Sequence, residues 1–151
     1  MNNDQKKIVI TSAVRTAIGT FRGSLKNIQA DELGSIVVKE AIKKSNLISD
    51  DIDELIMGQV LTASAGQNPA RQAAIKAGLP NEKTAYVINQ VCGSGLRSVA
   101  AGYQSILSKD SNIVIAGGQE SMTNAPHAIN ISGGKKLSES NLIDTMIKDG
   151  L

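Results

Sequence analysis

The stretch YVINQVCGSGLRSV, from Tyr86 to Val99, contains the change of pattern that decides the fold. Its apolar and partly β-branched first residues predict a strand over Tyr86–Asn89. Apolar residues then recur at helical spacing, which predicts a helix over Gly95–Ser108. The apolar positions of that helix are Leu96, Val99, Ala100, Tyr103, Ile106 and Leu107. A strand that runs directly into a helix is the repeating unit of α/β folds.

Strands and helices alternate on both sides of this stretch. β-Branched or apolar runs predict strands at Ile8–Ala13, Glu54–Met57 and Ile113–Ala116. A helix is predicted over Asp31–Ser45, because its apolar residues recur at helical spacing, its first turn is acidic and its last turn is basic. We therefore expect an α/β fold in which helices cover both faces of a mostly parallel sheet.

Residues typical of helix ends bound a further helix, and the alternation of strands and helices stops before the C-terminal tail. Asn68 suits the N-cap, Pro69 the first helical position, where its missing N–H needs no partner, and Gly78 the left-handed residue after the last turn. After Gly118, residues 119–151 are polar and rich in Gly and Ser, and they predict no fifth strand. Such a tail is unusual on a compact unit, so it is either a loop excursion or the start of a larger architecture.

The composition excludes several classes of protein. The chain has 151 residues, of which 41% are hydrophobic and 20% charged, a balance that favours one globular domain over disorder. Aromatic residues make up 2% and the basic residues do not cluster, so no nucleic-acid partner is expected. No apolar run approaches the roughly 18 residues of a membrane span and no secretory signal is visible, so no membrane association is expected. The single cysteine excludes an intramolecular disulfide and a thiolate zinc cluster, and we expect a cytoplasmic protein without a metal.

That cysteine, Cys92, lies where the strand ends and the helix begins. Ligands of open α/β sheets bind at the carboxyl ends of the strands. Free N–H groups and the positive helix end favour the thiolate, so we expect the thiol pKa to fall below its usual value of about 8.5. Gly93 and Gly95 allow a sharp turn and the close approach of a substrate. The pattern favours a presented nucleophile; the alternative is a small, buried hydrophobic side chain.

Other interpretations of nearby residues have less support. Residues 93–98, GSGLRS, are similar to a dinucleotide-binding G-x-G-x-x-G loop, but Ser98 replaces the third glycine and no suitable acidic residue follows. The only histidine, His127, comes 127 − 92 = 35 residues after the cysteine, and we expect it at the surface or in loop packing rather than in a Cys–His dyad. Gly117 and Gly118 form a turn near the cysteine loop or, by default, a tight exit from the sheet. The residues alone therefore indicate a half-site, an activated thiol without a base.

Five segments resemble the thiolase family, in the same order along the chain. They are RTAIGTFRGSL (Arg15–Leu25), LTASAGQNPARQAA (Leu61–Ala74), NQVCGSGLRSV (Asn89–Val99), AGGQESMTNAPH (Ala116–His127) and DTMIKDGL (Asp144–Leu151). The cysteine segment and AGGQESM are highly specific. Gly-Ser-Gly-Leu-Arg after the cysteine is more similar to the short-chain acetoacetyl-CoA type than to the long-chain degradative type.

The resemblance implies an acyltransferase that forms or cleaves acetoacetyl-CoA through an acetyl group carried on Cys92. Coenzyme A thioesters are the implied substrates, and no cofactor is bound permanently. Leu151 corresponds to the edge of the family's CoA pocket. The implied assembly is a homo-oligomer, a dimer or a tetramer. Leu61–Ala74 resembles a segment near the dimer interface, and the tail resembles the tetramer-forming loop.

The chain departs from the family in its length. Thiolases are well over twice as long, with two similar α/β halves and a loop domain inserted in the first. By this match, residues 1–118 are an incomplete N-terminal thiolase half and residues 119–151 begin the inserted loop domain. The family's Asn-Glu segment, Gly-His-Pro histidine and Cys-x-Gly-Gly-Gly second cysteine are absent, so we expect this chain alone to be inactive. The alternatives are a truncated, non-catalytic fragment that acts in assembly or interaction through uncovered apolar surface, and a Cys92–His127 hydrolase.

Overall fold

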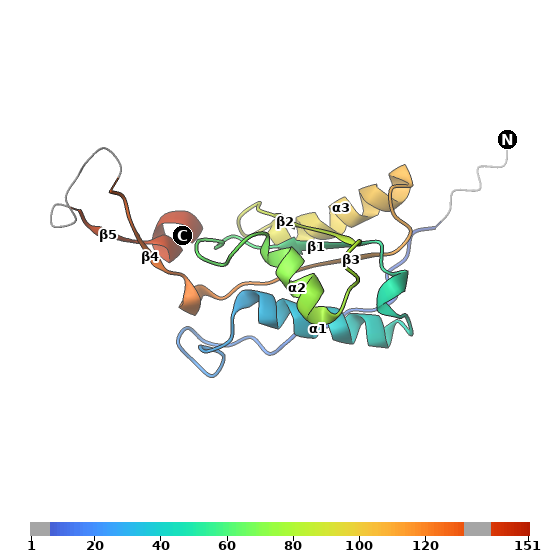
Figure 1. The fold of residues 1–151 in the computed structure, drawn as a ribbon, viewed down its shortest axis with the longest axis horizontal. Coiled ribbons are helices and arrows are strands. Elements are labelled where there is room, and N and C mark those ends of the chain that lie inside the picture. The colour runs from blue at the N-terminus through green and yellow to red at the C-terminus, as the bar shows by residue number, and fades with distance from the viewer. Residues whose placement is uncertain (1–6, 132–139) are drawn as a thin grey trace.

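A parallel sheet of three strands forms the centre of the molecule (Figure 1). The computed structural model describes residues 7–131 and 140–151. The strands lie in the order β2-β1-β3, with bounds Glu54–Gly58 for β1, Thr84–Ile88 for β2 and Val114–Gly118 for β3. β1 pairs in parallel with both neighbours, so Ile56 lies between Tyr86 and Ala116. The carboxyl ends of all three strands therefore meet at one edge of the sheet.

Helices cover both faces of this sheet, as the sequence predicts. α1 (Ala30–Lys44) and α2 (Pro69–Ala77) pack together on one face, and α3 (Ser94–Ser108) lies on the other (Figure 1). α2 connects β1 to its neighbour β2 on one side. α3 then connects β2 to β3, which lies on the other side of β1. This layering is the expected α/β fold.

The apolar core lies between the sheet and the α1–α2 pair. Leu55 and Met57 of β1 are completely or almost completely buried in it. Val38 of α1 and the alanines Ala70 and Ala73 of α2 are also buried there. The small alanine side chains let the two helices pack closely on each other and on the sheet.

The ends of α2 follow the punctuation of the sequence. Asn68 Oδ1 accepts a hydrogen bond from the Arg71 backbone N–H (3.2 Å), while Asn68 Nδ2 donates to the Ala85 carbonyl (2.8 Å). One side chain therefore caps the helix and ties it to β2. Pro69 is the first residue of α2, and Gly78 follows its last turn at φ 89°, in the left-handed region that favours glycine.

One predicted strand does not form. Ile8–Ala13, which lies within the described residues, makes no strand ladder, and Val9 and Ile10 are 69% and 79% exposed. The segment instead contacts α1, where Ser12 Oγ donates to the Ala41 carbonyl (3.1 Å). A β-branched run becomes a strand only where a neighbouring strand offers its hydrogen-bonding edge, so the prediction from residue type was wrong here.

The tail after β3 contains a short hairpin that the sequence did not predict. After a 3-10 turn, η2 (Met122–Asn124), strands β4 (His127–Ile129) and β5 (Leu142–Asp144) pair antiparallel and extend away from the sheet (Figure 1). A π-helical turn, η4 (Met146–Gly150), follows. The expectation of no fifth strand was wrong, because strands of three residues are too short to show the alternation that marks a strand in sequence.

α3 faces the sheet with its small residues and exposes its apolar ones. Its buried positions are Ser94, Ser98 and Gly102, which recur every fourth residue on one side of the helix. In contrast, Leu96 and Tyr103 are 79% and 52% exposed. The helix backbone can therefore approach the strands closely, while its apolar face points away from the sheet.

Gly58, at the end of β1, sets the distance between α3 and the sheet. A Cβ atom on Gly58 would meet the carbonyl carbon of Ser94 and lie 2.5 Å from the nitrogen of Gly95. A Cβ atom on Gly118 of β3 would lie 3.4 Å from the Gly95 Cα. Glycine is required at position 58 because the backbone of α3 itself occupies the space of a side chain.

Gly58→Ala tests this contact. The added methyl group would strike backbone that cannot move without shifting α3, so we expect the free energy of unfolding to fall by about 3 kcal/mol or more. Gly95→Ala is the matched control, because a Cβ atom there has nothing within 4 Å and alanine has the higher helix propensity. Urea unfolding followed by circular dichroism measures both, and equal stability of the two variants would contradict the close contact.

Asp53, just before β1, joins β1 to the start of β3. Its Oδ2 accepts hydrogen bonds from the backbone N–H groups of Asn112 (2.7 Å) and Ile113 (3.1 Å). These bonds, with a smaller contribution from the charge of Lys83, hold the pKa of Asp53 below its ordinary value against the opposing effect of burial.

The lowered pKa predicts how stability changes with pH. The Asp53 carboxylate stabilises the fold above its unfolded pKa, and this contribution is lost as the pH falls through the folded value. We expect Asp53→Asn to lower the free energy of unfolding by about 1 kcal/mol at neutral pH. Urea titrations should show this gap to wild type closing below about pH 4. Glu82→Gln, at an exposed position, is the control; a gap that does not vary with pH would refute the role of the charge.

Candidate active site

Cys92 lies at the carboxyl edge of the sheet, in the turn between β2 and α3. Its side chain is exposed, and the next residue, Gly93, is the N-cap of α3. The interpretation of Cys92 as a buried hydrophobic side chain is therefore wrong. Cys92 lines an open cavity of about 410 Å³. The remaining lining comes from the ends of β1 and β3 and the segments after them, the turn between β2 and α3, the start of α3 and the C-terminal turn, at residues 58–61, 91, 94–95, 118–120, 122 and 150–151.

The topology explains why the cavity forms at this place. The connection after β1 leads to β2 on one side, while β3 lies on the other side of β1, so the chain segments after β1 and β3 diverge. Ligand sites of open α/β sheets form at such points. Gly118 pairs with Gly58 in the β1–β3 register, and both line the cavity. Gly117 and Gly118 are thus the last residues of a strand rather than a turn, and the default prediction of a tight exit was wrong.

Two side chains hold the turn that presents Cys92. Val91 adopts φ 49°, a left-handed conformation that is costly for a β-branched residue. Its N–H donates to Asn89 Oδ1 (2.9 Å), and its carbonyl accepts from the Ser94 hydroxyl (2.6 Å), which itself accepts from the Gln90 N–H (2.8 Å). Neither Asn89 nor Ser94 was assigned a role from the sequence, although both residue types commonly bond to nearby backbone in turns.

Glu120 has the only carboxylate side chain among the described residues that line this cavity. Its Oε2 accepts a hydrogen bond from the Val60 N–H (2.8 Å), and its Oε1 accepts one from the Leu61 N–H (3.1 Å). Burial raises the pKa of Glu120, and the two hydrogen bonds partly oppose this rise. The sequence assigned no role to Glu120, because its partners are about 60 residues away in the chain.

The other residues singled out by the sequence have different places. Leu151 lines the same cavity as Cys92. His127 belongs to β4, where its Nε2 lies 3.9 Å from Asp144 Oδ2, and it does not line the cavity. The geometry therefore does not support a Cys92–His127 dyad. Within residues 7–131 and 140–151, no group of three or more His, Cys, Asp or Glu side chains is arranged to hold a metal ion. Over the same residues, no helix combines the length and apolar character needed to cross a membrane.

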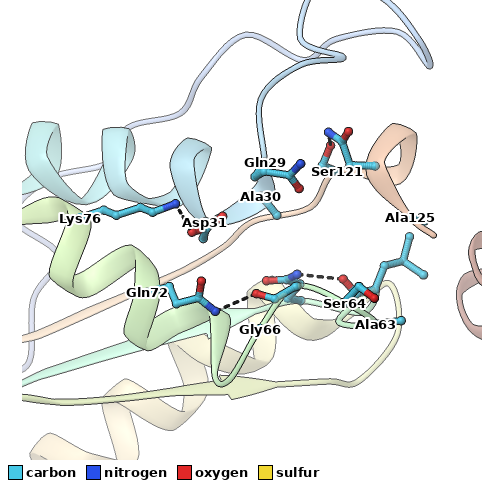
Figure 2. A pocket seen from close by; sticks show the side chains of 14 residues that line it. Gln29, Ala30, Asp31, Ala63, Ser64, Gly66, Gln72, Lys76, Ser121 and Ala125 are labelled. Atoms are coloured by element: carbon cyan, nitrogen blue, oxygen red, sulfur yellow. Dashed lines mark hydrogen bonds and ion pairs between the residues drawn. The ribbon is translucent and has the colours of Figure 1, made fainter.

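A second cavity, also of about 410 Å³, lies between the start of α1, the loop after β1 and η2 (Figure 2). Polar groups at its edge pair with one another. Lys76 Nζ lies 2.5 Å from Asp31 Oδ2, and Gln72 Nε2 donates to the Ala65 carbonyl (2.7 Å). Cys92 lines the first cavity and not this one, so we take the first cavity as the candidate active site.

A sequence profile described as thiolase, N-terminal domain, matches residues 8–151. The chain therefore belongs to the thiolase family and corresponds to its N-terminal domain. It is 57% identical over 145 residues to an acetyl-CoA acetyltransferase of Paracoccus denitrificans and 54% identical over 144 residues to one of Rhizobium meliloti. These alignments cover 96% and 95% of this chain but 37% of each relative. The chain thus spans little more than a third of the length of the curated relatives that it matches.

The fold is also that of a solved thiolase. The crystal structure of Acat5 thiolase from Ascaris suum in complex with coenzyme A superposes with a TM-score of 0.90 and 43% sequence identity. The match covers 94% of this chain and 37% of that chain. The family and the fold class expected from the sequence are both confirmed.

Ser94→Ala tests how the turn positions the thiol. The variant loses the hydrogen bonds of the Ser94 hydroxyl with the Gln90 N–H and the Val91 carbonyl, so we expect the turn to loosen and Cys92 to lose its place at the positive end of α3. A helix end stabilises an anion by roughly 0.3–1 kcal/mol, so alkylation by iodoacetamide at neutral pH should slow by about two- to fivefold. Ser108→Ala, at the exposed end of α3, is the control. An unchanged rate in folded Ser94→Ala protein would show that the turn does not activate the thiol.

Proposed function

We propose that Cys92 accepts an acetyl group from acetyl-CoA, and that the complete site acts as an acetyl-CoA C-acetyltransferase that forms or cleaves acetoacetyl-CoA. The observation that carries this proposal is an exposed thiol at the N-terminus of α3, in a cavity lined by the ends of β1 and β3 and by the turn after β2. The similarity to proteins named acetyl-CoA acetyltransferase supports the choice of the acyl group.

The proposed reaction has two half-reactions on one sulfur atom. The Cys92 thiolate attacks the thioester carbonyl carbon of acetyl-CoA, the new S–C bond forms, the bond to the CoA sulfur breaks, and the released CoA thiolate takes up a proton. A second acetyl-CoA, deprotonated at its methyl carbon, then attacks the acetyl-Cys92 carbonyl and releases the Cys92 thiolate and acetoacetyl-CoA. The reverse order cleaves acetoacetyl-CoA, and ping-pong kinetics follow from the covalent intermediate.

The residues of this chain supply the acyl-accepting part of this chemistry. The strained Val91 turn presents Cys92 at the N-terminal end of α3. Met122, Leu61 and Leu151 give the cavity apolar walls, and we place the edge of a CoA pocket at Leu151. CoA thioesters enter as substrates, and we propose no permanently bound cofactor. The coenzyme A complex of Acat5 thiolase supports this assignment.

Proton transfer in the second half-reaction needs groups beyond these. Glu120, the carboxylate in the described part of the cavity, already accepts a backbone N–H on each oxygen. We therefore propose that this chain alone is close to inactive. The family resemblance implies a histidine and a second cysteine for this step, in motifs that the present sequence does not contain.

The domain division and the assembly also remain proposals. We propose that residues 1–118 form the N-terminal thiolase half and that residues 119–151 begin an inserted loop domain. The change at Gly118, from the sheet to an outlying hairpin, supports this division (Figure 1). We propose a homo-oligomer with dimer contacts near Leu61–Ala74 and tetramer contacts through the tail. The cytoplasmic location rests on the single cysteine of the sequence.

A non-catalytic role in assembly or interaction is the second candidate function. It is favoured by the apolar face that α3 exposes, at Leu96, Val99, Tyr103 and Leu107. Contiguous exposed apolar surface is typical of protein interfaces. Light scattering that shows a monodisperse monomer, with no binding of a hydrophobic dye, would count against this role.

Mass spectrometry after incubation with acetyl-CoA tests the proposed acyl acceptor. We expect an acetyl group on the peptide that contains Cys92, removed again by free CoA, and no thioester in Cys92→Ser protein. A wild-type chain that is folded and alkylated at Cys92 but never acetylated would contradict the proposal. Robust acetoacetyl-CoA cleavage by the 151-residue chain would instead overturn the argument that it holds only half of the site.

A further inference from the structure

Val60 and Leu61 leave the sheet directly after β1, where the backbone loses its ladder partners. The last backbone hydrogen bond between the exits of β1 and β3 runs from the Gln119 N–H to the Gly58 carbonyl (2.9 Å). Beyond it, the Val60 and Leu61 N–H groups donate to the carboxylate of Glu120, at 2.8 Å and 3.1 Å. One side chain thus joins the diverging segments that follow two neighbouring strands.

The segment that Glu120 holds is a wall of the active-site cavity. Val60, Leu61 and Glu120 all line that cavity. Leu61 also packs against the C-terminal turn, since a Cβ atom on Gly150 would lie 3.0 Å from Leu61 Cδ2. A displacement of Leu61 would therefore also move the end of η4, which forms another part of the cavity.

A second connection leads from this segment to the nucleophile turn. Asn89 Nδ2 donates to the Val60 carbonyl at 3.5 Å, a long hydrogen bond, and Asn89 Oδ1 accepts from the Val91 N–H at 2.9 Å. Val91 is the residue that adopts the left-handed conformation directly before Cys92. The Glu120 carboxylate is therefore linked to the thiol through the backbone of Val60 and the side chain of Asn89.

We propose that Glu120 is a positioning residue for the thioester substrate, because its ionised carboxylate fixes residues 60–61 and, through them, the wall that an acetyl-CoA must pass to reach Cys92. Glu120 is not placed as a base, since both of its oxygens already accept backbone N–H groups. A protonated carboxyl group would lose one of these acceptors. Burial raises the pKa of Glu120 because an ionised carboxylate is costly to desolvate, and the two backbone N–H groups partly oppose this rise. The substrate in this inference rests on the proposed acyl transfer, whereas the geometry does not.

Glu120→Gln separates positioning from base catalysis. Glutamine keeps the size of the side chain but replaces one acceptor oxygen with an amide NH2, which cannot accept an N–H. In the protein as the cell makes it, we expect acetyl transfer from acetyl-CoA to Cys92 to slow by about tenfold. Alkylation of Cys92 by the small reagent iodoacetamide should stay within about twofold, because it does not use the cavity wall. Glu82→Gln is the matched control and should change neither rate.

Amide hydrogen exchange provides a readout that needs no substrate. In Glu120→Gln protein we expect the Val60 and Leu61 amides to exchange about tenfold faster, with the amides inside β1 unchanged. If this variant does not fold, Glu120→Asp, which is one methylene shorter and cannot reach both N–H groups, should show the same pattern.

Each outcome decides between the two proposals. Equal slowing of acetylation and alkylation would place the effect at the thiol itself and overturn the role of Glu120 in positioning the substrate. Unchanged exchange at Val60 and Leu61 would overturn that role as well. Faster exchange in a protein whose wild type never accepts an acetyl group would support the Glu120 clamp and refute acyl transfer.

Discussion

The backbone contact between the first turn of α3 and Gly58 is the constraint on which the rest of the structure depends. The space of a side chain at position 58 is filled by the main chain of Ser94 and Gly95, and Gly118 allows a similar approach on β3. This contact places the N-terminus of α3 over the ends of two strands. The turn that carries Cys92 is consequently held at the carboxyl edge of the sheet, where the segments after β1 and β3 separate.

The energetic costs of the site lie at the carboxyl edge of the sheet, whereas the main apolar burial lies on one of its faces. Val91 holds a conformation that costs roughly 1–3 kcal/mol, and Glu120 has a partly buried carboxyl group in the same cavity. The compensating apolar burial lies between β1 and the α1–α2 pair, around Leu55, Met57 and Val38. On the α3 side, packing relies on glycine and serine and on hydrogen bonds such as Ser98 Oγ to the Gly117 carbonyl (2.7 Å). Rigidity there comes from close backbone approach and fixed polar contacts rather than from a large apolar core.

Features with a local physical cause could be predicted from the sequence. The Asn68–Pro69 start and the Gly78 end of α2 depend on the conformational preferences of single residues, and the structure shows both. The position of Cys92 between a strand and a helix follows from a change of hydrophobic period within a few residues. The prediction of a strand at Ile8–Ala13 was wrong because it depended on more than local residue type. A strand also needs a neighbouring strand to pair with, and its own residues do not provide one.

The amino-acid sequence determined the types and order of the main elements, the flexible glycines around the thiol and the family to which the chain belongs. Only the tertiary structure decided which face of α3 meets the sheet, that Glu120 closes on the exit of β1, and that Leu151 reaches the cavity of Cys92 while His127 does not. These relations join residues far apart in the chain. They depend on strand order and on how closely backbones can approach, and neither quantity can be read from local residue patterns.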